Sequence, residues 1–322
     1  MEKLALGTVQ LGLPYGASNT IGLPSAEAAA GIVHLACSTG IAVLDTAHGY
    51  GLSEERIGAA LQAMSTAERP WVVTKIDAAV NDAPTSAEAA AIARQSLAMS
   101  RERLQVDTLD TVLLHHFRMY ADHDGAAWTV LREAKAKGEV QRIGCSTYLP
   151  SEVVEALADP DMQHIQLPFN LLASPFKTPE FAAAVAARPD VTIHVRSIYL
   201  QGILITDRTR WPAFAVESGL ADEVLAALDG LVAQLGREDK VDLALAYARG
   251  IPWISQVVLG AETEEQVRDN VRACATPALT AVEIATVDDA VAKLDIPEQL
   301  LTPGDWDGAV GFSNGQAPPP KL

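Results

Sequence analysis

The sequence is poor in basic residues, in cysteine and in aromatic side chains. Its 322 residues include 24 Lys and Arg against 41 Asp and Glu, which gives a formal net charge of −17. Nucleic acids and anionic membranes bind basic surfaces, so this balance argues against both as partners, although one small basic pocket for a phosphate remains allowed. Cys37, Cys145 and Cys274 lie far apart and show no metal-ligand spacing, which argues against a disulfide framework or a structural zinc site.

Long hydrophobic runs and targeting signals are also lacking. The most apolar segments, such as Ala26–Ala36, are shorter than the ~18 unbroken apolar residues of a membrane span. The start MEKLALGTVQLG has neither the basic residues nor the long apolar core of a signal peptide. Hydrophobic residues still form 49% of the chain, which is ample material for a buried core. We therefore expect a globular cytoplasmic protein with reduced thiols.

Short apolar runs alternate with helical patterns along the whole chain, a strand first and a helix after it. This order, without a long linker, predicts an α/β fold: one (β/α)8 TIM barrel domain over residues 1–302. The expected strands are Leu4–Thr8, Ile41–Ala47, Trp71–Ile76, Thr111–His115, Arg142–Ser146, His164–Leu167, Val191–Ser197 and Ser255–Leu259. The expected helices are Ser25–Ser38, Ser53–Ala63, Ser86–Arg103, Asp124–Gly138, Ser151–Ala158, Pro179–Ala187, Ala221–Gly236 and Thr263–Cys274.

Some segments fall outside this alternation. Asp239–Arg249 and Val282–Leu294 are predicted to be extra helices, and residues 303–322 a C-terminal tail that is loop or disordered. A doubly wound open sheet is the alternative fold. It would place a GxGxxG turn after the first strand, and the glycines at positions 12 and 16 do not fit that fingerprint.

Four kinds of polar side chain follow three consecutive expected strands, at the ends where barrels carry their active groups. Asp45 ends the second strand and Tyr50 lies in the loop after it; Lys75 ends the third; His115 and His116 end the fourth. Each residue type alone is more often structural than catalytic. Together, a Lys held charged by a carboxylate would lower the pKa of a neighbouring Tyr, and an imidazole would orient a carbonyl. This set predicts carbonyl reduction, and because no side chain supplies a hydride, it implies a nicotinamide cofactor.

These residues also match a known family. The run Leu44–Gly58, LDTAHGYGLSEERIG, closely resembles the signature of the aldo-keto reductases, and the resemblance extends over nearly the whole chain to Val258–Asn270. It implies that Tyr50 is the general acid/base, that Lys75 lowers its pKa and that Asp45 is the partner of Lys75. Asp110–His115 resembles the fourth strand of the family, which makes His115 the carbonyl-orienting group, with His116 as the competitor.

The resemblance further implies NADPH as cofactor, with NADH possible. In Gly144-Cys145-Ser146-Thr147 the threonine replaces the amide of a G-x-S-N motif that holds the nicotinamide carboxamide. The cationic clamp on the 2′-phosphate is absent, and Glu262 adds a carboxylate of the kind that NAD sites use. Asn170 fits the pattern of non-mammalian branches. The expected cofactor contacts are Thr8, Gln10, Asp45, Ser146, Thr147, Gln166, Arg196, Ser197, Leu200, Gly202, Gly260, Ala261, Glu262, Gln266 and Asn270.

Arg196 stands where many members of the family have an aromatic side chain that stacks on the nicotinamide. A guanidinium can also stack on a ring, but it disfavours the positively charged oxidised ring. Our hypothesis is that Arg196 weakens binding of the oxidised cofactor and biases the enzyme toward reduction. The alternative is an Arg paired with a carboxylate or a phosphate.

The substrate is expected to contact Tyr50, His115, His116 and Trp211, with pocket walls from 18–24, 117–120 and 211–214. Similarity to a bacterial branch found with cell-surface sugar genes suggests a sugar-like carbonyl. Three other functions remain open. They are a nicotinamide-binding regulatory or scaffold protein, a lyase forming a Schiff base at Lys75, and a metal site at the His pair. The metal site is disfavoured because adjacent strand residues face opposite ways.

Overall fold

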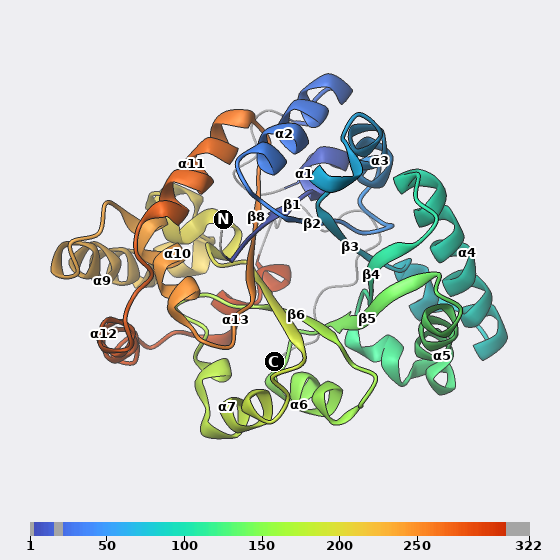
Figure 1. Ribbon diagram of the computed structural model, residues 1–322. Helices are drawn as coiled ribbons and strands as arrows, with labels where there is room; N and C mark the ends of the chain where they lie inside the picture. The colour runs from blue at the N-terminus through green and yellow to red at the C-terminus, as the bar shows by residue number, and fades with distance from the viewer. Residues whose placement is uncertain (1–2, 16–21, 307–322) are drawn as a thin grey trace.

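The computed structural model describes residues 3–15 and 22–306, and in them eight parallel strands close into a barrel (Figure 1). Each strand pairs with the next, and β8 pairs with β1 through the register Leu6↔Leu259. This confirms the predicted TIM barrel and excludes the open sheet. The strands are β1 Leu4–Gly7, β2 Val43–Asp45, β3 Trp71–Lys75, β4 Leu109–Leu114, β5 Val140–Ser146, β6 His164–Pro168, β7 Thr192–Arg196 and β8 Gln256–Gly260.

The helices surround the strands, and α9 and α12 lie farthest out on the left of Figure 1. Several begin at the polar caps that the sequence supplies: Ser25 accepts from the amide of Ala28, and Thr263 from that of Gln266. The helices are α1 Val9–Gly12, α2 Ala26–Ser38, α3 Ser53–Gln62, α4 Ser86–Leu104, α5 Asp122–Ala136, α6 Pro150–Ala158, α7 Pro179–Ala186, α8 Ala213–Glu217, α9 Leu220–Gln234, α10 Lys240–Gly250, α11 Glu264–Ala275, α12 Ala281–Val291 and α13 Glu298–Leu301.

Some boundaries differ from the sequence prediction. The expected helix from Asp124 begins two residues earlier, and its first turn contains left-handed backbone at His123, Asp124 and Gly125, with φ of 55°, 57° and 68°. Pro303–Asp305 forms a short 3-10 turn instead of loop. The expected division into a domain over 1–302 and a tail over 303–322 stays a prediction, and residues 307–322 lie outside the described residues. No helix within 3–15 and 22–306 is both long and apolar enough to cross a bilayer.

The interior of the barrel is polar along much of its axis. Near the amino ends of the strands, Trp71 Nε1 donates to Thr111 Oγ1 at 2.7 Å, and the Arg142 guanidinium lies 5.2 Å from the Trp71 ring. Above them, the rings of His164 and His194 meet edge to face with centroids 4.1 Å apart. His194 lies two residues before the carboxyl end of β7, so these polar side chains extend toward the carboxyl ends of the strands.

Candidate active site

The expected catalytic residues Asp45, Tyr50, Lys75 and His115 all line one cavity of about 470 Å³, a size typical of small-molecule sites. Asp45 is the last residue of β2 and Lys75 the last of β3, while His115 directly follows β4. Tyr50 lies in the loop between β2 and α3. The closed barrel brings the ends of neighbouring strands together, which explains why residues up to 70 positions apart meet at one cavity.

Lys75 and Asp45 form a buried ion pair at the base of the cavity. Lys75 Nζ lies 2.9 and 3.0 Å from the two carboxylate oxygens and donates to the carbonyl of Thr46 at 2.9 Å. Gln166 Nε2 donates to the same carboxylate at 2.6 Å. Burial lowers the pKa of Lys75, and the contact with Asp45 opposes that shift. The ammonium is therefore held charged by its partner, as the sequence argument expected.

Close backbone packing fixes the loop that carries Tyr50. The Tyr50 carbonyl accepts from the amide of Ser53 at 3.0 Å, at the start of α3. Gly12 packs against this turn so tightly that a Cβ there would lie 1.7 Å from the Tyr50 carbonyl oxygen. Gly51, with φ of +54°, would place its own Cβ 2.4 Å from the Gly12 carbonyl oxygen. Only glycine fits at these two positions, and together they lock the loop after β1 against the Tyr50 turn.

A buried polar group supports the same loop from behind. Glu54 is fully buried and accepts from Thr74 Oγ1 at 2.6 Å. Arg103 contacts the other oxygen of Glu54 at 3.4 Å and donates to the His48 carbonyl at 3.2 Å. This links α3, β3 and α4 beneath residues 48–50. The sequence argument did not foresee it, although an acidic side chain in the first turn of a helix is a recognisable signal.

The expected effect of Lys75 on Tyr50 is wrong in this structure. Burial raises the pKa of Tyr50 well above its usual value, Asp45 and Tyr15 raise it further, and the cation that opposes them is Arg196. Lys75 Nζ does lie 5.1 Å from the Tyr50 ring centroid, but its charge is matched by the carboxylate beside it. Tyr50 is therefore protonated at neutral pH, which is the form that delivers a proton to a carbonyl oxygen.

His115 lies beside Tyr50, with ring centroids 6.0 Å apart and an interplanar angle of 78°. Burial lowers the pKa of His115 well below its usual value, and His116 and Lys75 lower it further, so the imidazole is neutral. A neutral imidazole can donate to a carbonyl oxygen without carrying charge into the site.

His116 does not line the cavity. Its ring stacks on that of His115 with centroids 5.1 Å apart, and its Nδ1 lies 2.9 Å from Asn81 Nδ2. The expectation that these two side chains face opposite ways is wrong, because β4 ends at Leu114 and strand alternation no longer applies. The stacking still makes no metal centre: the described residues contain no group of three or more side chains able to hold one.

Most of the expected cofactor residues line the cavity: Thr8, Gln10, Asp45, Ser146, Gln166, Arg196, Ser197, Leu200, Gly202, Gly260, Glu262, Gln266 and Asn270. Thr147 and Ala261 do not. Thr147 is fully buried, its amide donating to the Gln166 carbonyl at 2.8 Å, and Ala261 is equally buried. The structure thus brings together the two ends of the expected site, near Ser146 and near Asn270.

Two buried amide oxygens in the cavity fit a nicotinamide dinucleotide. Gln166 uses its Nε2 on Asp45, and among the described residues neither its Oε1 nor that of Gln10 has a hydrogen-bond partner. Such acceptors suit the amino group of a carboxamide. The amino end of α11 follows β8 at the other end of the cavity, where Gln266 and Asn270 line the wall. The lining residues therefore fit the cofactor that the sequence implied.

The expected substrate walls are not where the cavity lies. Trp211 is buried in the core, 5% exposed, and it does not line the cavity. The described parts of the other expected segments, 22–24, 117–120 and 212–214, are also absent from its wall, and residues 18–21 lie outside the described residues. The large side chains of two of these segments, Phe117, Tyr120 and Phe214, pack against the hydrophobic core instead.

Several cavity residues were missed, and two of them, Tyr148 and Tyr15, act on Arg196. The Arg196 guanidinium lies 4.5 Å from the ring centroid of Tyr148, which follows β5. Tyr15, after β1, accepts from Gln201 Nε2 at 3.2 Å. Both tyrosines, with Phe176 and Asp269, line the cavity. Their positions just beyond strand ends were a usable signal for the two tyrosines, but the family motifs drew attention elsewhere.

Comparison with known proteins places the chain in a family. The profile described as "Aldo/keto reductase family" matches residues 3–292, nearly the whole chain. The protein belongs to the aldo/keto reductase family. The family match, with the oxidoreductase relatives below, makes it an NAD(P)H-dependent oxidoreductase, as the sequence argument expected.

Individual relatives are more distant. An uncharacterized oxidoreductase of Bacillus subtilis is 25% identical, covering 85% of this chain and 87% of its own length. A D-threo-aldose 1-dehydrogenase of a Pseudomonas species is 26% identical over 83% of this chain and 90% of its own. The structure resembles the holo form of an aldo-keto reductase from Bacillus halodurans, with a TM-score of 0.71, 22% identity, and coverage of 93% and 95%. That structural likeness supports the fold.

Proposed function

We propose that this aldo/keto reductase reduces an aldehyde or ketone to an alcohol, with Tyr50 as the proton donor. The observation that carries the proposal is the meeting of Asp45, Tyr50, Lys75 and His115 on one cavity, with Lys75 Nζ 2.9 Å from Asp45 and 5.1 Å from the Tyr50 ring. The bound nicotinamide supplies the hydride. The protein's own part is to hold the carbonyl and protonate its oxygen.

The roles follow from the charge states. Tyr50 keeps its proton until the carbonyl oxygen gains negative charge, because burial keeps its pKa high. The neutral His115 donates a hydrogen bond to the same oxygen and orients it. Lys75 and Asp45 form a fixed dipole behind the phenol. We assign the carboxamide end of the cofactor to Gln166, whose Oε1 has no partner among the described residues, and to Ser146 and Asn170 beside it.

The alternative functions find less support. A Schiff-base lyase needs a neutral Lys75 with a free lone pair, whereas Nζ donates to both oxygens of Asp45 and to the Thr46 carbonyl. A regulatory or scaffold protein of the same fold would have no need for a proton donor that stays protonated beside a neutral imidazole. Turnover of a simple aldehyde separates that alternative from an enzyme.

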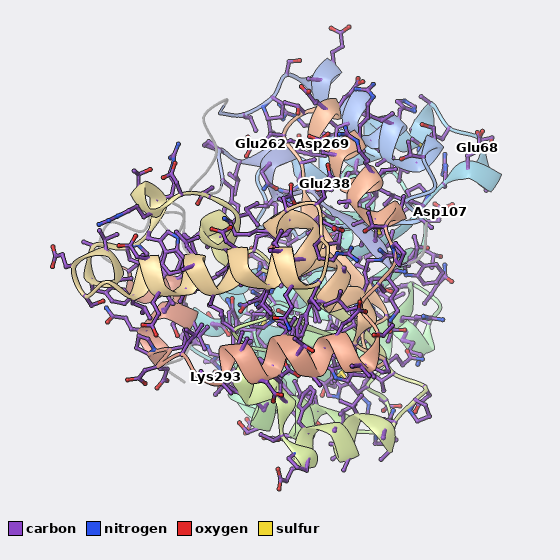
Figure 2. All side chains as sticks on the ribbon, turned by 90° about the vertical axis from the view of Figure 1, so that its left-hand side faces the viewer. Glu68, Asp107, Glu238, Glu262, Asp269 and Lys293 are labelled. Atoms are coloured by element: carbon purple, nitrogen blue, oxygen red, sulfur yellow. The ribbon has the colours of Figure 1, made fainter. Side chains whose placement is uncertain are left out.

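Two observations bear on the choice between NADPH and NADH, and they favour different nucleotides. The family resemblance favours NADPH. The cavity at α11 is lined by two carboxylates, Glu262 and Asp269, both labelled in Figure 2. Among the described lining residues the Lys and Arg side chains are Lys75 and Arg196, both near Tyr50. A carboxylate near the ribose repels a 2′-phosphate, so we propose that both NADPH and NADH serve.

The substrate is proposed to be a small carbonyl compound, sugar-like in size, because one relative is named as an aldose dehydrogenase. We propose a cytoplasmic location, since Cys37, Cys145 and Cys274 form no disulfide within the described residues, as in a reducing compartment. The acidic charge of −17 argues against nucleic-acid partners.

The test is a panel of aldehydes, ketones and aldoses with both reduced nucleotides, run on the wild type and on Tyr50→Phe. We expect the variant to lose turnover by a factor of about 10² or more, the usual contribution of a positioned general acid. Binding of the reduced cofactor, followed by its fluorescence, should stay unchanged. An undiminished rate in Tyr50→Phe would remove the phenol from its proposed role.

A further inference from the structure

Arg196 is a cation of the cavity, and within the described part of the chain it has no ion-pair partner. Its half-buried side chain extends from the end of β7 to the cavity wall and packs on the ring of Tyr148 at 4.5 Å. The groups that act on it are the hydroxyls of Tyr148, Tyr50 and Tyr15, and among the described residues no carboxylate is paired with it. The alternative from the sequence was an Arg paired with a nearby carboxylate or phosphate, and its carboxylate half finds no partner among the described residues.

The charges around Tyr50 leave one positive charge unmatched. Lys75 and Asp45 cancel each other as a contact pair. Glu262 and Asp269, the remaining described carboxylates of the wall, follow β8 and lie on α11. Burial raises the pKa of Glu262, and no cation acts on that pKa. Glu262 and Arg196 therefore do not form an ion pair. The end of the cavity where the carbonyl reacts is thus net positive.

A desolvated guanidinium is costly unless an anion meets it. Tyr148 packs against the guanidinium and also hydrogen-bonds it, which fixes the planar group in the cavity wall. A guanidinium has five N–H donors, so it can still bind a carboxylate or phosphate beside this tyrosine. The tyrosine hydroxyls beside it can add further donors. Arg196 and Tyr50 line the same cavity, so an anion bound at Arg196 would share that cavity with the carbonyl that Tyr50 protonates.

We propose that Arg196 is a specificity determinant that binds an anionic group, a carboxylate or phosphate, carried by the carbonyl substrate. This inference rests on the proposed carbonyl reduction and narrows its substrate class. It differs from the effect of Arg196 on the oxidised nicotinamide, because that effect is the same for every substrate and cancels when two substrates are compared with one cofactor.

Two substrate pairs that differ mainly in charge test the proposal: succinic semialdehyde against butanal, and glyceraldehyde 3-phosphate against glyceraldehyde. With saturating reduced cofactor, we expect the wild type to favour at least one anionic member by about tenfold or more in kcat/KM. The pair that shows the preference tells carboxylate from phosphate. In Arg196→Gln the preference should fall to about one. Arg118→Gln is the matched control, because it removes a half-exposed Arg that does not line the cavity.

The preference must depend on Arg196. Equal kcat/KM within both pairs in the wild type, or a preference that survives Arg196→Gln, overturns the proposal. A loss of cofactor binding in Arg196→Gln with an unchanged substrate ratio does so too. Calorimetric titration of 4-hydroxybutyrate and glycerol 3-phosphate into the enzyme–cofactor complex gives a readout without turnover. If neither ligand binds, or if Arg196→Gln binds them as the wild type does, the anion site is overturned. If the enzyme turns over none of the carbonyl compounds, carbonyl reduction itself is overturned.

Discussion

At the scale of single residues, the two ends of the cavity carry charges of opposite sign. Arg196 places a cation at the Tyr50 end, and Glu262 and Asp269 place carboxylates at the α11 end. A dinucleotide spans such a cavity with its reactive ring at one end and its adenosine at the other. In the proposed function, the cation faces the substrate and the nicotinamide ring, and the carboxylates face the ribose.

Glu262→Gln is predicted to improve the use of NADPH relative to NADH. Glu262 is 8% exposed, and its amide donates to Gln266 Oε1 at 2.6 Å, which fixes the turn before α11. Two charges about 4 Å apart repel by about 1 kcal/mol even in water, so we expect roughly a fivefold rise in the NADPH/NADH ratio of kcat/KM. The control is Glu238→Gln, an exposed carboxylate outside the cavity wall that is labelled in Figure 2. An equal NADPH/NADH ratio of kcat/KM in both variants would show that Glu262 does not discriminate between the two nucleotides.

At the scale of elements, the position of Tyr50 depends on two loops that pack tightly against each other. The loop after β1 contributes Gly12, and the loop after β2 contributes Tyr50 and Gly51. Ser53 ties the start of α3 to the same place, because its hydroxyl contacts the carbonyl and the hydroxyl of Thr8, each at 2.9 Å. The position of the phenol is thus set by packing between neighbouring βα units.

Gly12→Ala is predicted to displace the Tyr50 turn. Its Cβ would lie 1.7 Å from the Tyr50 carbonyl oxygen and 2.5 Å from the Ser53 amide, both backbone atoms that cannot move alone. We expect the free energy of unfolding to fall by roughly 1–3 kcal/mol and kcat/KM by on the order of 10², measured by urea denaturation and turnover.

Gly49→Ala is the control for this prediction. Gly49 is one residue from Tyr50, and a Cβ there meets nothing within 4 Å. It should keep both stability and rate close to the wild type. Equal behaviour of the two alanine variants would mean that the Gly12 contact does not position the phenol.

The sequence predicted the parts of this site that depend on strand order. Asp45, Lys75 and His115 end or directly follow buried runs, and the barrel rule brings strand ends together whatever the loops do. The contacts of Trp211, Tyr148 and Tyr15 depend on loop conformation, for which apolar periodicity gives no signal. Trp211 was placed over the substrate, yet its ring packs in the core.

Charge effects on titration were equally hard to predict. The pairing of Lys75 with Asp45 could be read from the sequence, but the balance that keeps Tyr50 protonated could not. Burial is the largest cause of the raised pKa of Tyr50, and burial depends on how the whole cavity closes. The cation that opposes it, Arg196, comes from a strand on the far side of the barrel from β2 and β3.

At the scale of the whole molecule, the polar column inside the barrel has a consequence for acid stability. His164 and His194 lie in the barrel interior beneath the site, 2% and 3% exposed, where most barrels have branched aliphatic residues. Burial lowers the pKa of His164 well below its usual value, and His194 and Lys75 lower it further. Both rings are therefore neutral in the folded protein near neutral pH, and an acid solution must either charge them in place or unfold the barrel.

His194 gives this effect a defined pH range. Burial lowers its pKa from 6.5 to about 4, with Lys75 also lowering and Asp45 opposing the shift. Above pH 6.5 the ring is neutral in both states. Between 6.5 and 4 the unfolded chain binds a proton that the folded chain does not, so the free energy of unfolding falls as the pH falls. The loss from this residue approaches about 3 kcal/mol at pH 4 and does not grow below it.

His194→Gln is predicted to reduce the loss of stability between pH 6.5 and 4.5, because it removes the group that takes up this proton while keeping a polar side chain against His164. Urea denaturation at several pH values measures how the free energy of unfolding changes with pH. A simple packing defect would lower this free energy equally at every pH and leave its slope against pH unchanged. His34→Gln, at an exposed position on α2, is the control and should keep the wild-type slope. If all three proteins lose stability equally per pH unit, the buried imidazole at 194 is not a site of acid-linked unfolding.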